Sequence, residues 1–150
     1  MILKNDLNNF IILYKYENEI ENLKKYFNHF LKFIDCTKFI NYITLPDNKI
    51  IDSSMLEIID SWIFAINFAM FNNMDHIFIC DTKCDIENIL NHDINLCYCN
   101  LIDYKIENDI ITETHCFYLK KYYYISFINS INNSYSIDSI FKNLKYVNYS

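Results

Sequence analysis

Residues 76–85 read HIFICDTKCD, an apolar run from Ile77 to Cys80 that leads into a polar loop containing Asp81 and Asp85. A short continuous apolar run of this kind is typical of a strand buried on both faces. Residues 10–14, FIILY, have the same character. In open α/β sheets, ligands bind just beyond the carboxyl ends of the strands. The stretch therefore predicts a central strand whose following loop is a candidate binding site.

Asp81 and Asp85 are the two carboxylates of this loop. Hard divalent cations such as Mg²⁺ and Mn²⁺ prefer oxygen ligands and are often shared with substrate phosphates. The pair is therefore a candidate metal site. In the alternative interpretation, Asp81 only ends the strand and Asp85 caps the helical turn that follows. The sequence leaves both interpretations open.

The rest of the chain alternates helical and strand-like segments. Apolar residues at helical spacing predict a helix over 17–33, and an almost wholly apolar surface predicts a buried helix over 56–71. Further helices are expected over 122–131 and over 137–144 with Ser136 as cap, a helical turn at 86–90, strands at 39–45, 95–101 and 117–118, and an exposed hairpin at 103–111. This alternation predicts an α/β fold, with a mostly parallel (mixed) sheet flanked by helices, in a single domain of residues 1–150.

The chain contains no glycine and no arginine. Phosphate-binding loops such as GxxxxGKS/T and GxGxxG need glycine for positive φ or close backbone approach, so sites of both kinds are excluded. Arginine clamps on phosphate are excluded as well. Lysine, a metal ion or a helix N-terminus must then hold any phosphate. The excess of Ile, Asn, Tyr, Phe and Lys indicates an AT-biased genome, such as that of a large DNA virus, a parasite or a reduced bacterium.

The formal net charge is −6 and no basic run occurs. This argues against nucleic-acid binding, because that affinity comes from Lys and Arg neutralising phosphates. The longest apolar stretch, residues 63–71, is far shorter than the roughly 20 residues of a membrane span, and the first residues lack the pattern of a secretory signal. We therefore expect an intracellular protein without a membrane span, in the host cytoplasm if the source is viral, with its cysteines reduced.

Cys80, Cys84, Cys97 and Cys99 lie in one region with His92 and form a scattered candidate metal set. Paired CxxC knuckles are absent, so the competing interpretation is that these thiols are buried and pack as small hydrophobic side chains.

Packing offers the simpler interpretation of three further features. His115 and Cys116 are adjacent, and side chains adjacent in a strand point to opposite faces, so they are not expected to act as base and nucleophile. Trp62 is expected to anchor the core. The tyrosines at 122–124 could stack on a base or a sugar ring, but one face of a helix start accounts for them equally well.

Read in order, these segments resemble the small GT-A-type glycosyltransferases of the lipopolysaccharide and procollagen-galactosyltransferase family, which includes members from giant DNA viruses. The matching segments are IIL at 11–13 followed by YKYENEIENL at 14–23, YITLPDNK at 42–49, IIDSW at 58–62, IFICDTK at 77–83, THCFYL at 114–119 and ID at 137–138. The resemblance covers residues 8–147, mostly by order and hydropathy. It implies a GT-A/Rossmann-like sheet in which the segments near residues 10, 42 and 77 are neighbours.

The resemblance also implies a chemistry. Members of the family transfer a sugar from a nucleotide-sugar donor to a glycan or protein acceptor, with Mn²⁺ or Mg²⁺ held against the diphosphate. On this basis Asp81 is the metal or diphosphate residue, Asp85 is its possible partner, and Lys15 is a nucleotide-side contact. Asp138 takes an acceptor-side catalytic or a structural role.

The chain also departs from the family pattern. A family arginine is replaced by Glu19, a family histidine by Trp62, and the acidic triplet keeps only Asp81. A degenerate, non-catalytic domain is therefore an alternative to an active enzyme. Two further alternatives are a viral interaction protein that binds through its tyrosine-rich C-terminal third and an all-helical host-defence module. The oligomeric state stays open.

Overall fold

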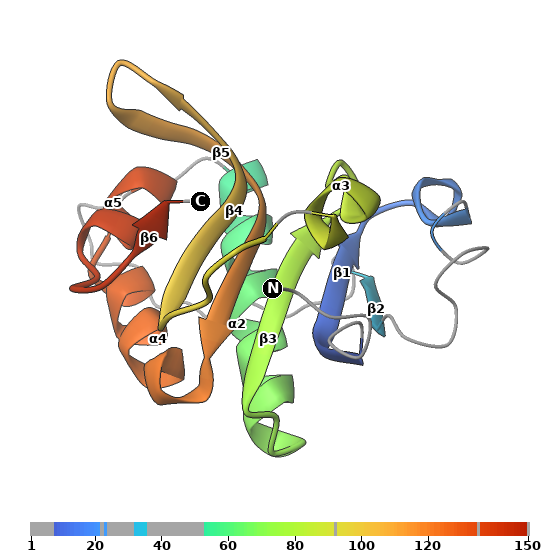
Figure 1. The fold of residues 1–150 in the computed structure, drawn as a ribbon, viewed down its shortest axis with the longest axis horizontal. Coiled ribbons are helices and arrows are strands. Elements are labelled where there is room, and N and C mark those ends of the chain that lie inside the picture. Colours follow the sequence, from blue (N-terminus) through green and yellow to red (C-terminus); the bar gives the residue numbers. More distant parts are fainter. Residues whose placement is uncertain are drawn as a thin grey trace.

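The computed structural model describes residues 8–21, 23, 32–35, 53–91, 93–134 and 136–149 (Figure 1). The strands in these ranges are β1 (Phe10–Tyr14), β2 (Lys32–Asp35), β3 (His76–Asp81), β4 (Cys99–Glu107), β5 (Ile110–Lys120) and β6 (Asn148–Tyr149). The α-helices are α2 (Ser53–Phe71), α3 (Ile86–Leu90), α4 (Tyr124–Asn132) and α5 (Ile137–Lys142), and the short 3-10 helices are η2 (Glu17–Glu19) and η4 (Lys121–Tyr123).

The strands form one mixed sheet in the order β2-β1-β3-β5-β4-β6. β1 pairs in parallel with both β2 and β3, and β4 pairs in parallel with β6. β5 runs antiparallel to its two neighbours, β3 and β4. The predicted α/β class, a mixed sheet flanked by helices, is thus confirmed, and the all-helical alternative is wrong.

Two apolar layers cover the two faces of the sheet, as the alternation of a strand requires. Ile77 and Ile79 of β3 face α2, α4 and α5, which contribute the larger core cluster. Phe78 and Cys80 face the other way, into a smaller cluster with Ile86 and other residues of α3 and its flanking segments. The structure confirms the strands predicted at 10–14 and 76–80 and the helix predicted at 56–71. These elements could be predicted because both faces of each strand, and nearly the whole surface of the helix, are apolar.

The helix predicted over 17–33 is wrong at both ends. Glu17–Glu19 form η2, and Lys32 and Phe33 belong to β2, where they pair with Ile11 and Ile12 of β1. Backbone pairing along β1 therefore takes precedence over the helical spacing of the apolar residues. The strand predicted at 39–45 lies outside the described residues.

The strand predicted at 95–101 begins too early, since β4 starts only at Cys99. The reason is the buried side chain of Asn100, which accepts a hydrogen bond from the backbone nitrogen of Cys97 at 2.8 Å and donates one to the carbonyl of Asn95 at 2.9 Å. These bonds satisfy the backbone locally and hold residues 95–97 as a loop.

Asparagine and aspartate take the left-handed positions that glycine fills in other proteins. The predicted hairpin at 103–111 is confirmed as β4 and β5, and it turns at Asn108 and Asp109, whose φ angles are 52° and 63°. Asn73, with a φ of 55°, follows the end of α2. Asn and Asp tolerate this region better than other residues with a Cβ atom, so tight turns form without any glycine.

Among the helices that the structure describes, none has the combination of length and apolar character needed to cross a membrane.

Candidate functional site

The candidate site is a cavity of about 360 Å³ at the carboxyl ends of β1 and β3. Its walls come from the end of β1, the end of β3, residues 112–115 of β5, and α2. After β1 the chain runs to β2 on one side, whereas β3 lies on the other side of β1. Ligands of open α/β sheets bind at such switch points. Asp81, at the end of β3, forms part of the cavity wall.

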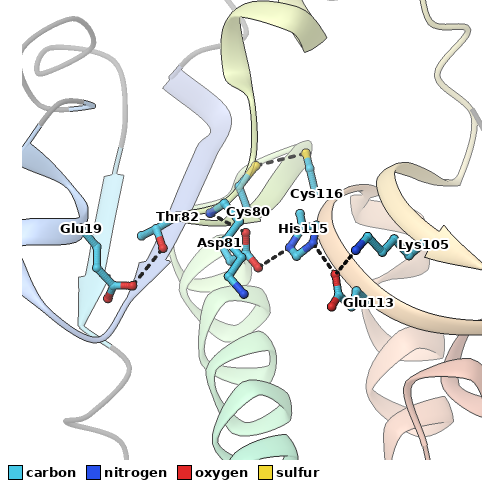
Figure 2. Close-up of polar contacts among 9 residues, drawn as sticks. Glu19, Cys80, Asp81, Thr82, Lys105, Glu113, His115 and Cys116 are labelled. Atoms are coloured by element: carbon cyan, nitrogen blue, oxygen red, sulfur yellow. Dashed lines mark hydrogen bonds and ion pairs between the residues drawn. The ribbon is translucent and has the colours of Figure 1, made fainter.

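Three titratable side chains form a line in this wall, the Asp81–His115–Glu113 relay (Figure 2). Asp81 Oδ2 lies 2.7 Å from His115 Nδ1, and His115 Nε2 lies 3.0 Å from Glu113 Oε2. Asp81 and His115 meet because Cys80 and Cys116, the residues before and after them, are partners in the antiparallel β3–β5 pair. A protonated imidazole donates from both ring nitrogens, so it satisfies both carboxylates.

The two neighbouring carboxyl groups favour the protonated form of His115. Burial of the ring lowers the pKa of His115, but the hydrogen bond and negative charge of Asp81, together with the hydrogen bond to Glu113, outweigh burial and raise it above its ordinary value. Burial raises the pKa of Asp81, with His115 opposing the shift. The hydrogen bond from His115 lowers the pKa of Glu113. The direction for His115 favours its imidazolium form, which can donate to both Asp81 and Glu113.

We expect protein stability to fall as the pH rises through the raised pKa of His115. A group whose pKa is raised by folding contributes fully below its unfolded-state pKa, here about 6.5, and loses that contribution above its folded-state pKa. The loss should be at most about 1 kcal/mol, as for a partly exposed ion pair. Besides Asp81 and Glu113, Asp103 on β4 raises the pKa of His115. Urea unfolding at a series of pH values measures the slope.

The His115→Gln variant should flatten this slope, because glutamine cannot take up a proton. His76→Gln is the control, since His76 lies at the far end of β3 outside the relay. An unchanged slope in His115→Gln would contradict the relay.

Glu19 ties the segment after β1 to the segment after β3 (Figure 2). Its Oε1 accepts from the backbone nitrogens of Tyr16 at 2.8 Å and Lys15 at 3.1 Å, and its Oε2 accepts from Thr82 Oγ1 at 3.2 Å. The bond from Tyr16 is the main cause of the lowered pKa of Glu19. Glu19 thus shapes the cavity rim.

Two lysines line the cavity. The Lys15 ammonium lies 2.6 Å from Glu57 Oε2 of α2, and both side chains are about half exposed. Lys83 follows β3, and its backbone nitrogen donates to Asp81 Oδ1 at 2.9 Å. The structure therefore brings Lys15 and Asp81, both predicted as site residues, to one cavity, and it adds Lys83.

Asp85 and Asp138 have structural contacts elsewhere. Asp85 caps α3, with its Oδ1 accepting from Asn88 N at 3.1 Å, and it is not among the described residues that line the cavity. Asp138 Oδ1 accepts from Ile111 N of β5 at 2.8 Å and lies 3.0 Å from Lys142 Nζ. The capping interpretation of Asp85 therefore matches the geometry, and Asp85 does not line the described cavity wall that contains Asp81.

The aromatic residues divide between core and surface. Trp62 is buried and packs edge-on against Phe117, with ring centroids 4.9 Å apart, so the predicted core anchor is confirmed. Tyr124 is buried and donates to the Met74 carbonyl at 2.9 Å. Tyr122, in contrast, is 79% exposed.

A second cluster, of three cysteines, lies on the opposite face of the same two strands, and Figure 2 shows two of its members, Cys80 and Cys116. The Sγ atoms of Cys80, Cys84 and Cys116 all lie within 4.8 Å of one another, and all three residues are buried. Hydrogen bonds with Cys116 and Cys80 lower the pKa of Cys84 to about 6, and burial raises the pKa of Cys80 and Cys116. The cluster could hold a metal ion.

The predicted metal set is only partly correct. Cys80 and Cys84 meet, but Cys116 joins them in place of Cys97 and Cys99. Cys97 is exposed, Cys99 faces the other core cluster, and His92 lies outside the described residues.

His115, Glu113 and Cys116 are the members of these clusters that the sequence did not assign to a site. One signal was available. In a strand, residues 113 and 115 lie on one face and residue 116 on the other, so the two titratable side chains share a face and the thiol points away from them. The sequence does not tell which strand pairs with this one, so the opposition of Asp81 and His115 could not be derived from it.

The chain matches no protein-family model and no curated protein.

Proposed function

We propose that this chain is a glycosyltransferase-like domain that binds a nucleotide-sugar at the cavity between β1 and β3. One observation carries the proposal. The cavity lies at the switch point of the sheet and contains both Asp81 and Lys15, the residues that the family resemblance assigns to the diphosphate and the nucleotide. These residues are 66 positions apart, so their meeting is not a consequence of local sequence.

The charges of the cavity suit a diphosphate with a divalent cation. Lys15 and Lys83 supply positive charge where arginine is absent. Asp81, Glu19 and Glu113 supply carboxylates. Magnesium-type ions are usually bound by one or two carboxylates plus substrate phosphates, and Asp81 with a diphosphate meets that pattern. Asp85 does not contribute, because it caps α3.

In the proposed chemistry, Lys15 and Lys83 bind the diphosphate of the donor as point charges. Asp81 would hold the divalent ion, and the ion would supply positive charge against the leaving diphosphate. His115 fixes the orientation of the Asp81 carboxylate through the 2.7 Å contact. Trp62 and Leu13 form an apolar part of the cavity wall, which excludes water from the sugar. The acceptor is a glycan or protein hydroxyl.

Hydrolysis and transfer of UDP-sugars in the presence of Mn²⁺ test the enzymatic part of this proposal. We expect slow, metal-dependent release of UDP by the unaltered protein and none by Asp81→Ala. Asp85→Ala is the matched control and should keep the activity, because Asp85 lies outside the cavity wall. Nucleotide binding without turnover would identify a non-catalytic descendant of the fold. Neither binding nor turnover would remove the proposal.

An exposed tyrosine cluster favours one second candidate, a viral protein that binds a partner in the host cell. The Tyr98 ring lies 5.6 Å from that of Tyr122 and 5.9 Å from that of Tyr146, and all three are exposed. Tyrosine is enriched at protein interfaces. The three tyrosines line a different hollow of the surface, which shares no residue with the cavity wall, so binding data can separate the two functions.

A further inference from the structure

Three cysteines from two strands and a loop converge on one point. Cys80 of β3 and Cys116 of β5 are directly opposed in the sheet, and their sulfurs are 3.1 Å apart. Cys84 reaches the same point because a tight turn returns the chain, with its backbone nitrogen donating to the Asp81 carbonyl at 3.3 Å. Two of the three sulfurs are thus placed by the central strands, which are rigid elements.

The setting is unusual for three thiols that only fill space. Cys80, Cys84 and Cys116 are exposed by 1%, 6% and 0%, and the rest of their cluster is apolar, including Ile12, Phe78 and Ile86. Carbon atoms of packed side chains rest about 3.5–4.0 Å apart, so the 3.1 Å approach of the two larger sulfur atoms is that of a hydrogen-bonded thiol pair and not ordinary packing. Cys99 gives the contrast: it is equally buried but packs in the other core cluster.

We infer that Cys80, Cys84 and Cys116 supply three thiolate ligands to a site for a thiophilic d¹⁰ metal ion, with Zn²⁺ as the preferred ion and a water molecule as the fourth ligand. Zinc binds thiolate at about 2.3 Å in tetrahedral geometry, which sets neighbouring sulfurs about 3.8 Å apart. The 4.8 Å limit of the cluster accommodates this spacing, and the Cys80–Cys116 pair needs to open by less than about 1 Å.

Charge favours Zn²⁺ over Cu⁺ at this site. Three thiolates around Zn²⁺ leave a net charge of about −1, whereas around Cu⁺ they leave about −2, and a buried charge is costly. Asp103, the partner of Cys116 on β4, acts electrostatically on both Cys84 and Cys116. Its negative charge repels the Cu⁺-loaded site more strongly than the less negative Zn²⁺-loaded site. Each ligand thiol gives up its proton to solvent when the metal binds.

A metal ion at this site would stabilise the cavity wall from the opposite face of the sheet. Cys80 and Cys116 directly precede and follow Asp81 and His115 on the same strands. A metal bridging β3, β5 and the turn at Cys84 would therefore hold the relay in register. The metal site does not depend on the proposed nucleotide-sugar function, because it uses the opposite face of the sheet.

Metal binding to the full chain, purified reduced and metal-free, tests this inference. Titration with Zn²⁺ against a chromophoric chelator should give one tightly bound ion, and Co²⁺ should give the charge-transfer absorption of tetrahedral thiolate coordination. Titration with Cu⁺ against a Cu⁺ chelator under anaerobic conditions is the second arm. With Zn²⁺ about 100-fold above its Kd, the Tm should rise by about 5–11 °C.

Cys84→Ser should weaken Zn²⁺ binding more than about 100-fold, since loss of a ligand exceeds the 10–100-fold cost of losing an outer-shell partner. Cys84 is the preferred site for substitution because it lies in a loop, where a substitution should destabilise the fold less than one at Cys80 in the central strand β3. The control is Cys99→Ala, which removes an equally buried thiol outside the cluster and should leave the affinity unchanged.

Circular dichroism of each metal-free variant checks that it folds. If Cys84→Ser fails to fold, the unaltered protein gives the same test. Bound Zn²⁺ should then protect Cys80 and Cys116 from an alkylating reagent. Tighter binding of Cu⁺ than of Zn²⁺ would overturn the choice of metal. Absence of binding, equal affinity in Cys84→Ser, or a stable Cys80–Cys116 disulfide under cytosolic thiol conditions would overturn the site.

Discussion

Replacing Phe117 with alanine will lower the free energy of unfolding by about 3–5 kcal/mol, the usual cost of deleting a fully buried aromatic side chain. Phe117 lies on β5 and is 1% exposed. Its ring lies 4.9 Å from that of Trp62, 5.2 Å from Phe127 and 5.3 Å from Phe141. One side chain thus joins the sheet to α2, α4 and α5. Domains are stable by only about 5–15 kcal/mol, so the variant should be barely stable.

Urea unfolding followed by circular dichroism and by Trp62 fluorescence measures this effect. Phe71→Ala is the matched control: Phe71 is the last residue of α2 and is 91% exposed, so its removal should change stability by no more than about 0.5 kcal/mol. Equal effects of the two substitutions would mean that α2 does not pack on the sheet through Trp62 and Phe117.

Replacing Asp138 with alanine will lower stability by about 1.5–3 kcal/mol, as expected when a charged acceptor is removed from a hydrogen bond. The Asp138 side chain is 18% exposed and accepts from the Ile111 backbone at the start of β5. Removing it leaves that N–H group without its acceptor and breaks one link between α5 and the hairpin. Asp138→Asn should cost less, because the amide oxygen can still accept.

Glu107→Ala is the control for Asp138, since Glu107 is an exposed carboxylate on the same hairpin. Thermal unfolding of the three variants is sufficient. A stable Asp138→Ala variant that loses UDP-sugar transfer would assign Asp138 to the acceptor side and contradict the structural role.

Segments with one dominant local pattern were predictable from the sequence. β1 and β3 are short apolar runs, and α2 is apolar around nearly its whole circumference, so each was located to within a few residues. Ser136 was correctly predicted as the cap of α5. In the structure its hydroxyl accepts a hydrogen bond from the backbone N–H group of Ser139. In these cases local chemistry and tertiary environment require the same structure.

Features that depend on long-range pairing were not predictable. β2 exists because its backbone pairs with β1, although its residues continue a helical pattern. Asp81 was identified as a site residue from its position after a strand, but His115 enters the site only through the β3–β5 register. The same register opposes Cys80 to Cys116, which lie 36 residues apart. A sequence with no glycine and no repeated motif contains no local signal for that register.

The measurement that tests the central claim most directly is an amide NMR titration of the labelled protein with UDP-sugar and Mn²⁺. Paramagnetic broadening reports where the ion binds. We predict that it is strongest at Lys15, Thr82, Lys83 and Glu113, around the cavity at the ends of β1 and β3, and that Asp81→Asn abolishes it while Asp85→Asn does not. Broadening centred on the exposed tyrosine cluster, or none at all, would contradict the assignment of this cavity as the nucleotide-sugar site.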